Sequence, residues 1–216
     1  MGLIACLALV IGLVAPAAAR QPTKKLLPRM VVPDASLARL SDRLRQKFAF
    51  YSTPQDAAAS SVDPNDTGAD LRRMGRIAGY VRGRNAAGAF FRRAPKGLLA
   101  VGTSAILCRD ARSATASIKH DIAVSKRLRG KAIDSGRLIS FAATKVPPLG
   151  PGAVLVHVRV RPRDGTDLFT TAVAFPLGSL RGNTTVARGD RKNADAMALN
   201  LGQQLRRRML ATLGGK

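Results

Sequence analysis

Apolar and polar residues alternate between positions 153 and 161, and this alternation constrains the fold more than any other feature of the chain. The valines at every second position from Val154 to Val160 fall on one face of an extended strand. The residues between them fall on the other face: Leu155, His157, Arg159 and Arg161. A turn sequence, Arg-Asp-Gly-Thr-Asp at 163–167, leads into a second apolar run at 168–177. An antiparallel hairpin is therefore predicted, with its first strand central and half-buried and with Arg159 and Arg161 reaching solvent.

Other segments add strands and helices to this hairpin. Strands are predicted at 74–84, 98–108 and 138–146, with a short further candidate at 183–188. A helix is predicted from Asp110, which can cap it, to Gly130, and another begins at about Asn193. This order predicts the α+β class, with an antiparallel β-sheet of about five to six strands packed against two or three helices.

The residues before this α+β domain, which spans 71–216, divide into four parts. Residues 1–19 read as a secretory signal peptide, because an apolar run is followed by Pro16 and by three alanines before Arg20. Residues 20–33 are expected to be an extended linker. Residues 34–51 are expected to be helical, because apolar residues recur there at helical spacing, at Leu37, Leu40, Leu44 and Phe48. Residues 52–70, rich in Ala, Ser, Asp, Pro and Gly, read as a flexible linker or loop.

The leader has one unusual feature, because Lys and Arg are absent before its apolar run and follow it instead. A start upstream of Met1 would supply the missing basic residues. The alternative is that the segment stays uncleaved and anchors the chain in a membrane. A secreted or extracytoplasmic envelope location is the main expectation.

The order of elements, together with three stretches of sequence, resembles the PsbP-like fold, and especially a set of exported actinobacterial proteins of unknown function. The stretches are Gly75 to Val81, Leu107 to Ala114 and the helix that starts at Ala194, and the similarity extends over about Leu71 to Leu213. These are packing patterns. The resemblance implies a sandwich of sheet and helices and an exported protein, and it implies no catalytic residue.

Residues able to perform catalysis are few and widely spaced. After leader removal Cys108 is the one cysteine, its apolar setting predicts burial, and it has no disulfide partner. His120 and His157 lie at no recognisable catalytic or zinc-ligand spacing. We therefore expect a non-catalytic protein without metal or cofactor, and keep an unrecognised enzyme as a further alternative.

The charge balance points to the kind of partner. Lys and Arg total 36 against 13 acidic residues, all of them Asp, and the net charge is +23. The clustered basic residues are candidates for binding anions: Arg72, Arg73, Arg76, Arg92, Arg93, Lys126, Arg127, Arg129, Arg159, Arg161, Arg206, Arg207 and Arg208. The leading hypothesis is a basic exported or cell-envelope domain that binds anionic surface material, such as wall polymer or phospholipid headgroups, or a small ligand. The alternative, a nucleic-acid-binding protein, lacks aromatic residues beside these clusters for stacking on bases.

Overall fold

The computed structural model describes residues 21–214, except for 62, 87–95, 134–135 and 163–164. The described residues form one antiparallel sheet of eight strands in the order β1-β2-β3-β8-β7-β6-β5-β4. The strands are β1 Gln46–Ser52, β2 Arg76–Asn85, β3 Leu98–Cys108, β4 Ala132–Ile133, β5 Gly136–Lys145, β6 Val154–Arg161, β7 Leu168–Leu177 and β8 Leu180–Arg188. The expected α+β class with an antiparallel sheet is confirmed, and the sheet has more strands than expected.

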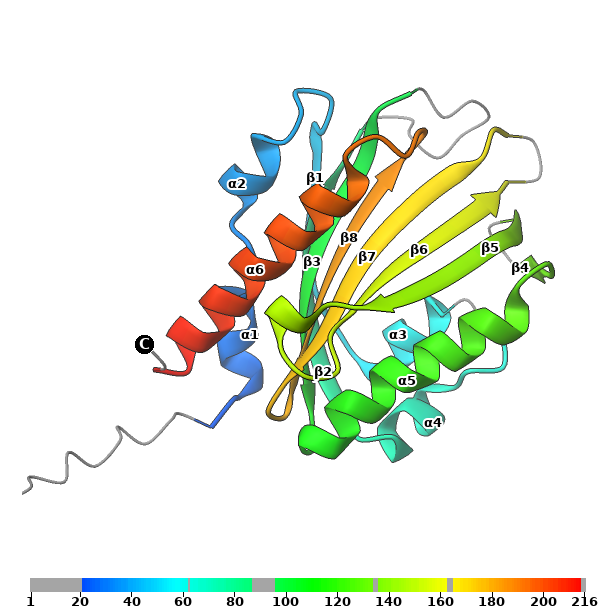
Figure 1. The fold of residues 1–216 in the computed structure, drawn as a ribbon. Coiled ribbons are helices and arrows are strands. Elements are labelled where there is room, and N and C mark those ends of the chain that lie inside the picture. Colours follow the sequence, from blue (N-terminus) through cyan, green and yellow to red (C-terminus); the bar gives the residue numbers. More distant parts are fainter. Residues whose placement is uncertain (1–20, 62, 87–95, 134–135, 163–164, 215–216) are drawn as a thin grey trace, which may run out of the picture.

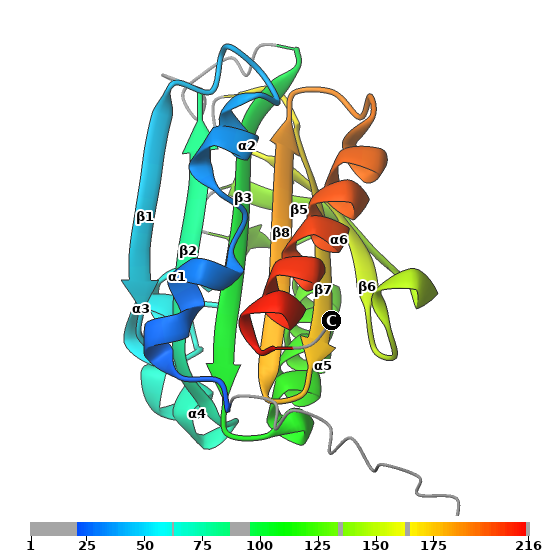
Figure 2. The same ribbon diagram turned by 90° about the vertical axis from the view of Figure 1, so that its left-hand side faces the viewer.

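Helices cover both faces of this sheet (Figures 1 and 2). One face packs against α6 (Ala194–Thr212), α1 (Leu27–Met30) and α2 (Asp34–Ala38). The other face packs against α5 (Ala111–Leu128), α3 (Pro54–Ala59) and α4 (Gly68–Arg73). Two short 3-10 turns, Lys24–Leu26 and Pro147–Leu149, complete the described helical segments. The sheet is therefore the middle of three layers.

The main hydrophobic core lies between the sheet and α6. Phe175 and Val186 of the strands and Leu205 and Met209 of α6 are completely buried. Segment 27–44 contributes to the same core, since Leu27, Met30, Val31, Val32 and Leu37 are also completely buried. The predicted extended linker at 20–33 is therefore wrong for its described part: its apolar residues are core residues.

Two further predictions for the N-terminal third are corrected. The predicted helix at 34–51 ends at Ala38, and the chain then forms β1, in which Phe48 and Phe50 alternate and pair with Gly83 and Val81 of β2. The helical spacing ran across two different elements. The predicted loop at 52–70 contains α3 and α4, each begun by a capping box, Thr53 with Asp56 and Thr67 with Asp70.

The alternating strand, β6, is mostly half-buried. Its one fully buried apolar side chain is Leu155, 8 % exposed, on the face turned toward the main core. The valines on the opposite face are only half-buried. The face that packs on the main core is that of Leu155, from which Arg159 and Arg161 were expected to reach solvent; Arg161 is exposed there, and Arg159 is half-buried. Val154 and Val156 lie on the side of the sheet that faces α5.

A candidate anion-binding cleft

Two arginines from distant parts of the sequence meet on the α5 face of the sheet. Arg76 is the first residue of β2 and Arg181 is the second residue of β8. Strand β3 lies between them, with Cys108 paired to Arg76 and Ile106 paired to Arg181. The sheet thus brings together side chains that are more than a hundred positions apart in the sequence.

Glycines beside each arginine fix its position. Gly75 ends α4 with φ +92°, and an added Cβ there would lie 2.4 Å from Oγ of Ser113. A side chain at this position would push the start of β2 away from α5. Gly182, next to Arg181, lies under the ring of Phe175, which an added Cβ would meet at 2.3 Å. Close packing on the main-core face therefore sets how β8 presents Arg181 on the other.

Arg181 is almost completely enclosed, with its side chain 9 % exposed. Its Nη2 donates to Oδ2 of Asp121 at 2.5 Å, and its Nη1 donates to Oγ of Ser117 at 3.4 Å. Both acceptors lie on α5. Its Nε is buried and has no acceptor among the described residues. Arg181 therefore keeps an unused hydrogen-bond donor inside the protein.

Arg76 is half-buried and makes fewer contacts. Its Nη2 donates to Oγ of Ser52 at 3.2 Å, and its buried Nε has no acceptor in the described part of the chain. Burial, together with the positive charge of Arg181, lowers the pKa of Arg76 to about 10. The charge of Asp121 opposes this shift only in part. Each arginine thus makes the other's charge more costly.

Cys108 is buried beside this pair, as the sequence predicted, and is 1 % exposed. Burial raises the pKa of its thiol, and the nearby arginines only partly offset this rise. Cys108 is therefore a neutral packed side chain at this position.

The two arginines line a cleft of about 450 Å³ on the α5 face. Its floor includes the polar side chains of Ser104 and Asn183, and its walls come from α5 and from the segment that contains α3. Two further carboxylates line it, and both are engaged locally: Asp56 caps α3, and Asp66 accepts hydrogen bonds from Ser61 and His120. Asp121 is the carboxylate that contacts an arginine of the cleft.

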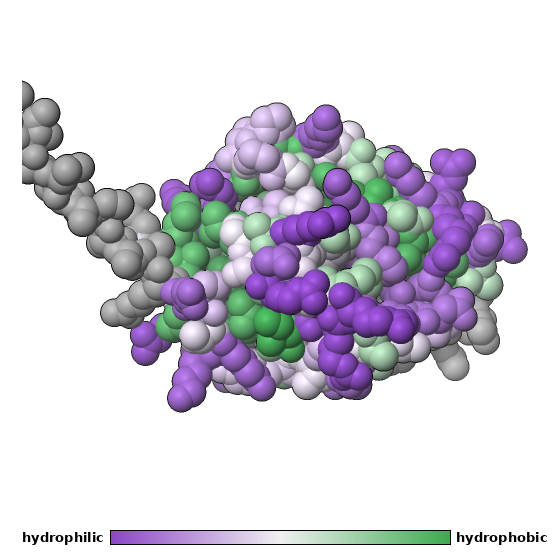
Figure 3. All heavy atoms as spheres, turned by 90° about the horizontal axis from the view of Figure 1, so that it is seen from below, coloured by the Kyte–Doolittle hydropathy of each residue, from purple (hydrophilic) through white to green (hydrophobic). Residues whose placement is uncertain are grey.

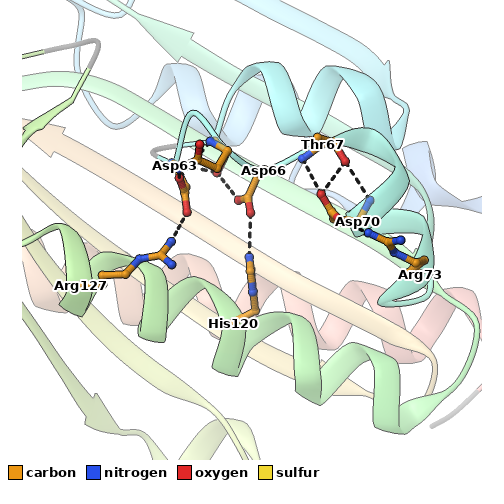
Figure 4. A network of polar contacts seen from close by, with 9 residues as sticks. Asp63, Asp66, Thr67, Asp70, Arg73, His120 and Arg127 are labelled. Atoms are coloured by element: carbon orange, nitrogen blue, oxygen red, sulfur yellow. Dashed lines mark hydrogen bonds and ion pairs between the residues drawn. The ribbon is translucent and has the colours of Figure 1, made fainter.

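The connection between α3 and α4 forms one wall and is tied to α5 by a hydrogen bond and an ion pair (Figure 4). Nε2 of His120 lies 3.1 Å from Oδ1 of Asp66, and Arg127 pairs with Asp63. Asp63 is 3 % exposed and also accepts from the backbone and side chain of Asn65 at 3.0 and 3.1 Å. The hydrogen bond from the Asn65 backbone is the largest of the effects that lower the pKa of Asp63. The wall is therefore held to α5 by polar contacts of two aspartates.

This arrangement suits an oxyanion. Carboxylate and phosphate oxygens accept several hydrogen bonds at once, and guanidinium groups match their geometry. Such a group between Arg76 and Arg181 would supply acceptors for unused donors and offset the repulsion between two positive charges. Among the described residues, no three His, Cys or Asp side chains are grouped so that they could hold a metal ion.

A larger cavity, of about 650 Å³, lies on the other face near the start of α6. Its charged groups are mostly paired: His157 lies 2.8 Å from Asp195, and Arg159 pairs with Asp167. Arg191 lies 5.0 Å from the ring centroid of Phe169. The buried hydrogen-bond donors that lack an acceptor among the described residues are on Arg76 and Arg181, not in this cavity. The Arg76–Arg181 cleft is therefore the stronger candidate.

The other basic residues singled out in the sequence are dispersed. Arg72 and Arg73 are exposed on α4, Lys126, Arg127 and Arg129 are exposed at the end of α5, and Arg206 and Arg207 lie on α6 across the sheet. Figure 3 shows the side of α4 and α5, where hydrophilic side chains are spread between smaller hydrophobic groups. These clusters do not form one basic surface.

Several of these arginines stabilise the fold locally. Arg159 and Arg161 both pair with Asp167, and Arg208 donates to the carbonyl oxygens of Arg29 and Val31 at 2.9 and 2.8 Å. Arg92 and Arg93 lie outside the described residues, as does the predicted signal peptide. Of the predicted anion-binding residues, Arg76 is the one that lies in the cleft.

Arg181 was not predicted. The sequence signal for it is the alternation that begins at Leu180, with Arg181, Asn183 and Thr185 on one face of β8. The predicted strand at 183–188 begins three residues after the observed start of β8 and therefore places Arg181 outside the sheet. A strand that begins at Leu180 would have placed it on the sheet.

Comparison with known proteins gives one informative result. No protein-family model matches the sequence, and no curated protein matches it. The fold is similar to that of the extracellular domain of PknH from Mycobacterium tuberculosis, with a TM-score of 0.58 and 10 % sequence identity. The match covers 89 % of this chain and 99 % of that chain. It shows a shared fold. None of the helices in the described part of the chain is long and apolar enough to cross a membrane.

Proposed function

We propose that this chain is a non-catalytic binding domain, exported from the cell or held in the cell envelope, that captures an anionic group of a small ligand between Arg76 and Arg181. The observation that carries the proposal is the pair of buried Nε atoms without acceptors on two neighbouring guanidinium groups. A buried donor without a partner costs about 1–3 kcal/mol, more when it is charged. A ligand oxyanion that accepts hydrogen bonds from these two Nε atoms would remove this cost, and the free energy of binding would gain by the same amount.

Two observations support the exported location. Residues 1–19 have the apolar run and small residues of a cleavable leader. The fold is also shared with an extracellular domain, that of PknH. We include in the proposal that this chain is related to exported proteins with the PsbP-like fold.

Binding of anionic surface material, by contrast, has weaker support from the arrangement of charges. Arg72 and Arg73 lie on one side of the sheet, and Arg206 and Arg207 lie on the other. At physiological salt the screening length is about 8 Å, so clusters this widely separated act independently. A single cleft with two converging arginines is the better site.

Titration with inorganic phosphate, acetate and sodium chloride, followed by calorimetry and thermal unfolding, tests the proposal. We expect saturable binding of phosphate or acetate in the wild type and its loss in Arg181→Gln and Arg76→Gln. Arg207→Gln is the control, because Arg207 is exposed on α6 and has no ion pair among the described residues. Equal binding by all four proteins, or no saturable binding by any, would overturn the proposal.

A further inference from the structure

We infer that the ligand is an anionic amphiphile, with its charged group at Arg76 and Arg181 and an unbranched apolar chain beneath α5. This inference rests on the proposed function and names the ligand class for the same site. It follows from a second cavity, of about 180 Å³, that adjoins the cleft at Arg181. Both cavities are lined by Asp121, Ser125, Arg181 and Asn183, so they are neighbours around one side chain.

The second cavity is apolar away from Arg181. It lies between α5 and strands β5, β6 and β7, and its apolar lining includes Ile118, Ile122, Phe141, Val154, Val156 and Ala174. A charged group at one end and an apolar lining at the other match the two parts of an amphiphile.

Small side chains explain why this space exists. On β7, Ala174 and Ala172 stand opposite Val154 and Val156 of β6 in the sheet register. Alanine side chains fill less of the space between the sheet and α5 than larger side chains would. The valines beside them are consequently half-buried, whereas Phe175 and Val186 on the main-core face are completely buried. The main-core face is closely packed around Phe175 and Val186, whereas the space beneath α5 is loosely filled.

The apolar cavity continues toward the surface. It shares Ile118, Ile122 and Val154 with a groove of about 500 Å³ between α5 and residues 145–154. Pro147 and Pro151 line this groove, and Lys119 and Lys145 lie along it. At about 30 Å³ for each water-sized group, the inner cavity holds roughly six methylene groups, and a longer chain can extend into the groove.

A chain-length series tests the inference on the unmodified protein. The probes are straight-chain carboxylates of four, six, eight and ten carbons, with decyl phosphate and decanol, all below their aggregation concentrations. We expect affinity for the carboxylates to rise about fourfold for each buried methylene. Decanol should bind at least tenfold more weakly than decanoate, since it lacks the charge. Whichever of decanoate and decyl phosphate binds more tightly shows whether the site prefers a carboxylate or a phosphate.

Variants that fill the apolar cavity provide an independent test. Ala172→Leu and Val156→Phe, on different strands, should remove the dependence on chain length and leave the response to phosphate unchanged. Ala123→Leu is the matched control, because Ala123 is exposed on α5 next to Ile122. The series on the wild type stands even where one filled variant fails to fold.

Each outcome distinguishes the two proposals. Equal affinity for butyrate and decanoate, with binding lost in Arg181→Gln, overturns the amphiphile and leaves the anion site. Equal affinity for decanol and decanoate shows that the arginines take no part in binding the chain, which also overturns it. Absence of binding by every anionic probe, phosphate included, overturns the proposed function itself.

Discussion

Arg76 is expected to favour ligand binding while lowering the stability of the ligand-free fold. Its pKa is lowered to about 10 because burial and Arg181 both disfavour its charge. We expect Arg76→Met, which keeps the apolar stem, to raise the free energy of unfolding by about 1 kcal/mol without ligand. Because the folded-state pKa lies below the unfolded one, this gain should be constant at every pH well below 10. Urea unfolding checks it, with the exposed Arg72→Met as control; a loss of stability would show that the guanidinium makes net favourable contacts.

Asp167 is one of the aspartates that should make the fold sensitive to acid. Hydrogen bonds from Arg161 and then Arg159 hold its pKa below the ordinary value of 3.8. A carboxylate with a lowered folded-state pKa stabilises the fold above its unfolded-state pKa, and this stabilisation is lost as pH falls through the folded-state value. Arg161 is 55 % exposed, so solvent screens part of the interaction.

We therefore expect Asp167→Asn to cost about 1 kcal/mol of unfolding free energy at pH 7. The difference from wild type should shrink as pH falls below 3.8. Asp42→Asn is the control, since Asp42 is exposed and forms no ion pair with a described residue. Chemical unfolding at pH 7, 4 and 3 measures both variants. A difference that is the same at every pH would contradict this assignment.

Among the elements, the connection between α3 and α4 depends on few contacts that one substitution can remove. Asp63→Ala removes the acceptor of Arg127 and of both Asn65 donors. We expect a local loss of about 2 kcal/mol, seen as faster amide hydrogen exchange in residues 63–67 and unchanged exchange in α6. Uniform acceleration throughout the chain would show that Asp63 stabilises the whole molecule instead. Asp42→Ala serves as the reference substitution.

Elements with a strong local signal were predictable from sequence. The strands at 98–108 and 168–177 and the helix capped by Asp110 agree with the structure, because patterning and caps act locally there. Strand β1 was not predictable in this way. Its residues continue the helical spacing of Leu37 and Leu44, and only pairing with β2 makes them a strand. The sequence of this segment is compatible with a helix and with a strand, and the tertiary contact with β2 makes it a strand.

The candidate site was predictable only in part, for a similar reason. Arg76 stood out as a member of a basic cluster, whereas Arg181 is a single arginine between Leu180 and Gly182. Their meeting requires the register between β3 and β8, which no local pattern specifies.

For the molecule as a whole, almost all of the few described aspartates already take part in ion pairs, hydrogen bonds to histidine or helix caps. The excess that gives a net charge of +23 is therefore mostly unneutralised. Self-repulsion of this size destabilises a compact state and is screened by salt.

We expect the unfolding temperature to rise between 10 and 300 mM sodium chloride, because added salt screens this repulsion. The rise should persist in Arg76→Met, which separates general screening from occupation of the cleft. Calorimetric scans across the salt series measure it. A falling unfolding temperature would show that ion pairs outweigh the repulsion.

The order of the strands has a consequence for how the chain folds. Within β1 to β3, and within β4 to β8, each strand pairs with the strand that precedes or follows it in the sequence. Among the described strands, the pairing of β3 with β8 alone connects these two groups. Closing so long a loop costs the most entropy, so this step should set a slow folding rate. Arg76 belongs to one group and Arg181 to the other. An anion that needs both meets no binding site until the two halves have joined, and it should therefore slow unfolding while leaving the refolding rate unchanged.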